Sequence, residues 1–78
     1  MKQKELRGQL FEKMLNEYAS RNMIVWTRLA KPHFRVILPN HTVDIFTTGL
    51  KYHIIDLNER GSLNDLNDAI GLLDFLKN

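Results

Sequence analysis

The spacing of hydrophobic residues changes twice along the chain, from a helical period to strict alternation and back. Near the N-terminus the apolar side chains follow a 3.6-residue repeat, which predicts an amphipathic helix over residues 3–21, ended by Asn22 in the left-handed conformation. A second stripe predicts a closing helix that begins at a Ser62 cap paired with Asp65. The two stripes are Leu6, Leu10, Phe11, Met14, Leu15 and Tyr18, then Leu63, Leu66, Ala69, Ile70, Leu73 and Leu76.

Between the helices, β-branched and aromatic residues alternate with polar ones in short segments. These segments are residues 23–29, 33–38, 42–48 and 52–57, and residues 58–61 are expected to form a loop. Short connections favour neighbouring antiparallel strands over crossovers. The sequence therefore predicts one α+β domain over residues 1–78. Its order is helix, three- or four-stranded antiparallel meander, helix, with both helices packed on one face of the sheet.

A two-residue turn in each hairpin fixes which side chains share a face. Arg35 then lies opposite Asp44, with Trp26 beside Arg35 and His53 beside Phe46. One face becomes the core, with Val25, Phe34, Val36, Val43, Ile45 and Ile54. The other is expected to be open, with Trp26, Arg28, His33, Arg35, Asp44, Phe46, Lys51 and His53.

Composition limits the cell compartment and the classes of partner. The 78 residues include no cysteine, so disulfides cannot supplement a thin core, and an intracellular, cytoplasmic protein is expected. Self-association is the other common supplement, which makes a homodimer an alternative. No apolar run is long enough to span a membrane, and the charged N-terminus does not have the pattern of a secretory signal. The net charge of +2 divides into +5 for residues 1–39 and −3 for residues 40–78, which is weaker than the basic stripe of typical nucleic-acid binders.

The aromatic and basic side chains of the open face are the candidate binding residues. They are Trp26, Arg28, His33, Arg35, Phe46 and His53, joined by Phe75 beside Gly71 on the closing helix. Tryptophan, phenylalanine and arginine are typical of protein-binding hot spots, so a protein partner is the leading interpretation. Stacking on unpaired bases of RNA or single-stranded nucleic acid is the alternative. A helix that crosses this face would instead make Trp26 and Phe46 core residues.

The sequence gives little support for catalysis. His33 and His53 are expected two strands apart, roughly 9–10 Å, which is too wide for one zinc ion. A phosphate-binding glycine loop, a nucleophile elbow and a metal-ligand motif are all missing from the sequence, so no enzyme, cofactor or metal is predicted. A small ribonuclease that depends on His33 and His53 is a third hypothesis.

The segment VDIFTTGLKY, residues 43–52, is followed by Glu59-Arg60-Gly61 and a terminal helix. This half of the chain resembles small phage and prophage proteins that carry a strand motif of the type V-D-F-Y-P-T-T-G-K-W, an R-G turn and a short helix. The resemblance implies a phage-encoded accessory protein that binds host or defence proteins, and it transfers no catalytic residue. The element order is also similar to double-stranded-RNA-binding domains, but residues 62–65 are acidic where that family needs a lysine cluster.

Overall fold

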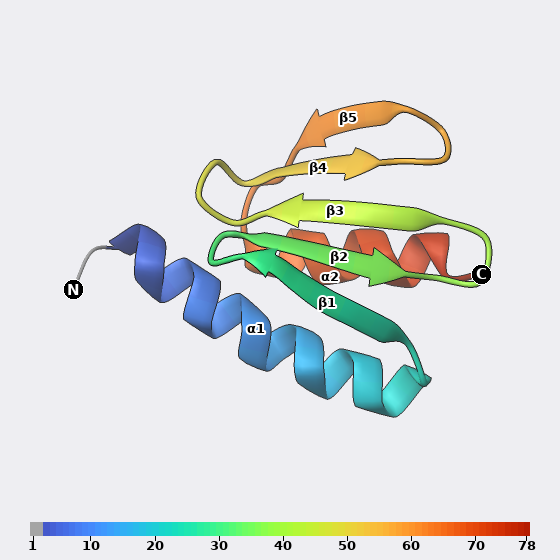
Figure 1. Ribbon diagram of the computed structural model, residues 1–78, viewed down its shortest axis with the longest axis horizontal. Coiled ribbons are helices and arrows are strands. Elements are labelled where there is room, and N and C mark those ends of the chain that lie inside the picture. Colours follow the sequence, from blue (N-terminus) through green and yellow to red (C-terminus); the bar gives the residue numbers. More distant parts are fainter. Residues whose placement is uncertain (1–2) are drawn as a thin grey trace.

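The computed structural model describes residues 3–78, with side chains from residue 5 onward, and these residues form an α+β fold. Helix α1 (Gln3–Asn22) precedes five antiparallel strands, and helix α2 (Leu66–Leu76) follows them (Figure 1). The strands are β1 (Val25–Ala30), β2 (His33–Ile37), β3 (Thr42–Phe46), β4 (Lys51–Ile54) and β5 (Glu59–Ser62), and they lie in sequence order in one sheet. The predicted fold class is confirmed, but the segment expected to be a loop at residues 58–61 contributes the fifth strand.

Both helices pack on one face of the sheet, where a single hydrophobic core joins them. Phe11 of α1 meets Phe34 of β2 edge-on, with ring centroids 5.2 Å apart. The core also includes Leu15, Tyr18, Val36, Leu38, Val43, Ile45, Ile54, Leu63, Leu66, Ala69, Leu73 and Leu76. In Figure 1, α2 lies behind β2 and β3, so the viewer sees the sheet from the side without helices. The predicted stripe of α1 was wrong at Leu6 and Leu10, which are both exposed.

The start of α1 passes close to the turn between β1 and β2, and Gly8 makes this approach possible. A Cβ at position 8 would lie 3.1 Å from the carbonyl oxygen of Lys31. Further along, Met23 rather than Asn22 takes the left-handed conformation after the helix, with φ of 55°. Asn22 instead donates its Nδ2 hydrogen to the Tyr18 carbonyl over 2.8 Å.

The closing helix is capped by Asp65, not by Ser62 as predicted. The Asp65 carboxylate accepts a hydrogen bond from the Asp68 backbone N–H over 2.8 Å, and the Asp68 carboxylate accepts one from the Asn64 N–H over 2.9 Å. Ser62 lies in β5, opposite Lys51. The aspartates therefore perform the reciprocal capping that the sequence assigned to serine.

An irregularity in β1 shifts part of the predicted pairing with β2 by one residue. Ala30 lies opposite His33, but Arg28 lies opposite Phe34, so an extra residue interrupts the register between them. A shift of one residue moves every side chain to the other face. Trp26 therefore lies opposite Val36 and packs against Phe34 on the helix side, with ring centroids 5.9 Å apart. The predicted places of Trp26 and Arg28 on the open face were wrong.

The same irregularity turns Val25 outward, so its predicted place in the core was also wrong; its exposed fraction is 68%. Between β3 and β4, a turn over residues 47–50 replaces the assumed two-residue turn, and Leu50 takes a positive φ of 51°. This moves the register by two residues, so Lys51 lies opposite Phe46 and His53 opposite Asp44. An even shift leaves each side chain on its predicted face.

Candidate functional site: the open face of the sheet

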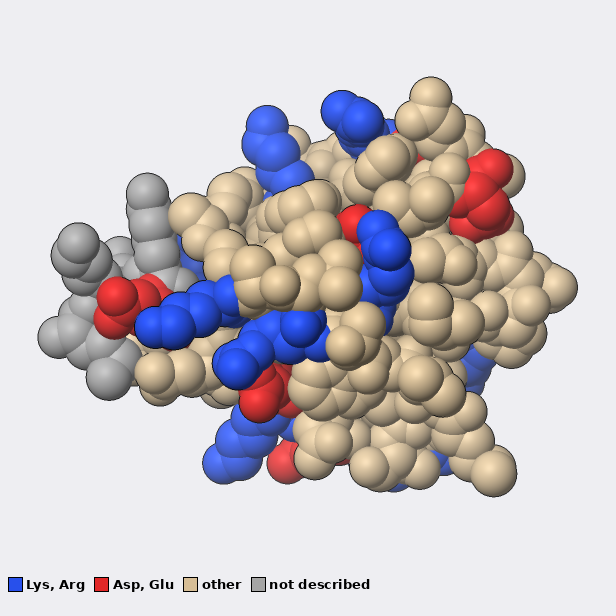
Figure 2. Space-filling view, in the orientation of Figure 1, with Lys and Arg blue, Asp and Glu red and all other residues tan. Residues whose placement is uncertain are grey.

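The open face is the side of the sheet without helices, and its side chains form three rows across the strands. The apolar row is Val25, Ile37, Thr42 and Ile55, the last placed by the hydrogen bond from its N–H to the Thr42 carbonyl. The charged row is Thr27, Arg35, Asp44, His53 and Arg60. The stacked row is His33, Phe46, Lys51 and Ser62. Figure 2 views this face and shows basic side chains among mostly uncharged ones.

Asp44 lies at the centre of the charged row and bonds to two of its neighbours on the open face. Its Oδ1 accepts a hydrogen bond from Arg35 Nε over 2.8 Å, and its Oδ2 accepts one from Arg35 Nη2 over 3.0 Å. His33 Nε2 lies 2.8 Å from the same Oδ2. Only 3% of Asp44 is exposed, and this burial alone would raise the pKa of its carboxyl. The hydrogen bonds from Arg35 and His33 outweigh burial, so the pKa of Asp44 stays below its ordinary value.

The aromatic part of the open face is a stack of His33 on Phe46. The two rings lie 4.3 Å apart at an angle of 28°, and the His33 nitrogen that points to Asp44 ties the stack to the charged row. His53 contacts Asn58 Oδ1 through its Nε2 over 3.2 Å. Four of the predicted binding residues therefore share one surface: His33, Arg35, Phe46 and His53.

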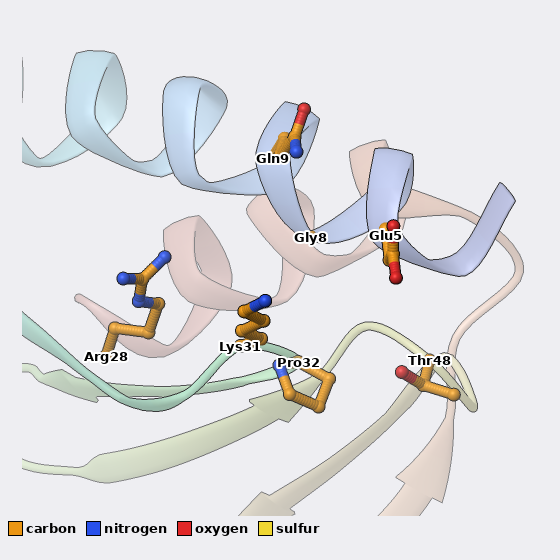
Figure 3. Close-up of a pocket in the computed structure, with 7 residues that line it drawn as sticks. All are labelled: Glu5, Gly8, Gln9, Arg28, Lys31, Pro32 and Thr48. Carbon is orange, nitrogen blue, oxygen red and sulfur yellow. The ribbon is translucent and has the colours of Figure 1, made fainter. Parts of the chain in front are cut away.

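Arg28 lies on the opposite side of the sheet, where its Nη1 donates to Glu12 Oε1 of α1 over 3.0 Å. It lines a hollow of about 270 Å³ between α1 and the turns of the sheet, together with Glu5, Gly8, Gln9, Lys31, Pro32 and Thr48. Figure 3 shows Arg28 and Lys31 extending towards the helices. Contrary to the prediction, Arg28 therefore does not contribute to the open face but forms an exposed ion pair with α1.

Phe75 projects from α2, away from the rows of the sheet. Its exposed fraction is 78%, and a Cβ at the neighbouring Gly71 would meet nothing within 4 Å. It borders a shallow hollow with His41, Asp74, Leu76 and Asn78. His41 Nδ1 in turn lies 2.8 Å from Asp56 Oδ2. Phe75 is thus an exposed aromatic residue, as expected, but not part of the open face.

Another hollow, of about 600 Å³, lies where β3 and β5 end and β4 begins. It is lined by Phe46, Gly49, Lys51, Tyr52, His53, Arg60, Gly61 and Ser62. The sequence predicted no binding role for Arg60, which was expected in a loop, or for Ser62, which was expected to cap the closing helix. The one available signal was Gly61, which lies opposite Tyr52, since a cross-strand aromatic ring can cover a glycine.

No family model, curated protein or solved structure matches this chain, so the resemblance to phage proteins stays a prediction. Within residues 3–78, no helix is both long and apolar enough to cross a bilayer. The same residues contain no group of three or more metal-ligating side chains gathered around one point.

Proposed function

We propose that this protein acts by binding another protein through the open face rather than by catalysis. The observation that carries the proposal is the apolar row, in which Val25 and Ile37 are exposed side by side and Ile55 is exposed on the other side of Thr42. Single exposed aliphatic residues are common on protein surfaces, but adjacent ones on a sheet face favour a contact with a partner. A partner surface with a matching apolar strip would bury this row.

The charged row next to it supports the proposal through its rigidity. Arg35 is held by two hydrogen bonds to the buried Asp44, so little side-chain entropy remains to be lost when a partner binds. Arginine next to apolar residues is a frequent hot-spot residue because it combines hydrogen bonding with apolar contact. The partner is therefore expected to place an acceptor group over Arg35 while its apolar strip covers Ile37.

The identity of the partner follows only from the resemblance of residues 43–61 to phage proteins. That resemblance implies a host or defence protein, and the lack of cysteine supports a cytoplasmic site of action. A second copy of the chain is the alternative occupant. An interface through the apolar row predicts binding that changes little with ionic strength.

The test compares two variants of the open face with matched controls on α1. Ile37→Asp and Arg35→Ala should abolish capture of specific partners from an extract of the source cells, while Lys13→Ala and Glu17→Gln should capture them as the parent does. Circular dichroism should show all four variants folded. Retention of every partner by Ile37→Asp contradicts the proposal. Sedimentation of the purified protein separates the alternatives, because a homodimer through this face should become a monomer in Ile37→Asp.

The ribonuclease hypothesis stays a prediction, and one observation favours it: Asp44 orients His33 as a carboxylate orients a general base. However, the hollow that could hold a substrate is lined by His53 and not by His33, so the two imidazoles do not face one space. Loss of RNA cleavage in a His33→Ala, His53→Ala double variant would support catalysis. Equal activity of that variant and the parent on RNA would end the hypothesis.

A further inference from the structure

We propose that the hollow at the ends of β3, β4 and β5 binds a nucleotide, with Lys51 and Arg60 on its phosphate and Phe46 against its base. This site lies on the stacked and charged rows, at the far side of the open face from the apolar row. The site is independent of the protein-docking function. Loss of nucleotide binding without loss of partner binding, or the reverse, can therefore be detected.

The charges of the hollow point to an anion. Lys51 lies opposite Ser62 and Arg60 opposite His53, so the two cations are diagonal neighbours on adjacent strands, about 7–8 Å apart at their backbones. Across the part of the chain that the structure describes, the ion pairs involve other residues, and neither cation has a carboxylate within 4.0 Å. This leaves both available to phosphate oxygens, to which Arg60 can present a planar fork.

The nearby carboxylates do not neutralise this pair. Asp44 is buried beneath Arg35 and His33, and its charge is already matched by Arg35. Asp56 is engaged by His41 and by the Thr42 N–H. Glu59 lies opposite Ile54, so alternation along β5 directs it to the face opposite Arg60. The hollow therefore has an excess of positive charge that the fold itself does not use.

The size and the wall of the hollow point to a ligand larger than phosphate. Its volume of about 600 Å³ falls within the range of small-molecule sites, roughly 300–1,000 Å³. Phe46 is half-buried and forms one wall, and its stack with His33 holds the ring in place. A fixed aromatic ring beside two cations is the combination that proteins use to hold a base and its phosphate. A carboxylate peptide would use the cations but not the ring.

The experiment is a titration followed by two-dimensional amide NMR with four probes: AMP, inorganic phosphate, an eight-nucleotide single-stranded RNA and an octaglutamate peptide. AMP should shift the amides of residues 46, 51, 53 and 60–62 saturably and should bind more tightly than inorganic phosphate. A Lys51→Ala, Arg60→Ala double variant should weaken AMP binding roughly tenfold or more, because two charge-assisted contacts are lost. Lys13→Ala with Arg21→Ala removes the same charge from the exposed surface of α1 and should leave it unchanged.

Phe46→Leu separates the ring from the charges, because it should weaken AMP binding without affecting inorganic phosphate. Tighter binding of the RNA than of AMP identifies a nucleic-acid strand as the ligand, and equal binding of the two identifies a free nucleotide. The proposal is overturned if AMP and RNA do not saturate, if both double variants lose affinity equally, or if the peptide binds most tightly. Ile37→Asp should not change any of these results, so failure of protein docking leaves this site standing.

Discussion

Replacement of Asp44 by asparagine tests whether the buried carboxylate organises the open face. The substitution keeps the size of the side chain but removes its charge and one of its two acceptor oxygens. The amide hydrogens of the introduced side chain would then point at Arg35 or His33, which also donate. We expect the variant to fold but to be clearly less stable than the parent at pH 7.

The magnitude follows from the three hydrogen bonds that Asp44 accepts, all between 2.8 and 3.0 Å. A hydrogen bond to a charged group contributes about 1.5–3 kcal/mol, and the asparagine oxygen keeps at least one of them. The Arg35 side chain is 38% exposed, so water can replace some of the hydrogen bonds that it loses. The expected loss is therefore about 2 kcal/mol in the free energy of unfolding. For a chain of this length, that loss lowers the Tm by roughly 8–16 °C.

Urea unfolding followed by the fluorescence of Trp26, the only tryptophan, measures this loss, and Glu17→Gln on α1 is the isosteric control. The pH dependence adds a second criterion. Because the pKa of Asp44 is lowered in the folded protein, its stabilisation is complete above the ordinary aspartate pKa and disappears as pH falls through the lower value. The difference between Asp44→Asn and the parent should therefore shrink below about pH 4. A difference under about 0.5 kcal/mol at pH 7, or one that persists unchanged in acid, would refute the reasoning.

Three further predictions concern Trp26, Gly61 and Tyr18. Trp26→Ala should lower the free energy of unfolding by about 2–3 kcal/mol, as followed by circular dichroism, because its ring packs on Phe34. The control Phe75→Ala should change it by less than about 0.5 kcal/mol, and equal losses in the two variants would contradict the packing of Trp26 on Phe34. Gly61→Ala should lower the free energy of unfolding by about 1–2 kcal/mol, because its Cβ would overlap the Tyr52 ring. The same substitution made in a Tyr52→Ala variant should cause no such loss, and an equal loss in both backgrounds would contradict the contact. Burial and a hydrogen bond to Asp74 raise the pKa of Tyr18 to about 12, so its stabilisation is complete below the ordinary value near pH 10 and decreases as pH rises towards 12. Tyr18→Phe should remove that alkaline loss in equilibrium unfolding, and an unchanged profile would locate its origin elsewhere.

Periodicity predicted the two helices, the meander and the face of the sheet that they cover. The pairing of β2 with β3 was also predicted residue by residue, because this register and the one shifted by a residue could both be tested against the sequence. Only one register places Arg35 opposite Asp44 while Val36 meets Val43. The fifth strand was not predicted, because residues 59–62 bury no apolar side chain and contain the glycine that makes room for Tyr52.

The failure at β1 has a different cause, and it decides where the apolar row lies. A one-residue bulge leaves no compositional mark, because Val25–Ala30 offers an acceptable apolar side chain to the core in either register. Tertiary packing selects the register with Trp26 on the helix side, where its ring packs on Phe34, which in turn meets Phe11 of α1. That choice turns Val25 outward beside Ile37, and it pairs Arg28 with Glu12. The surface proposed for docking therefore depends on how the half-buried Trp26 packs against the core, so substitutions that relax the bulge should alter partner binding even though they contact no partner.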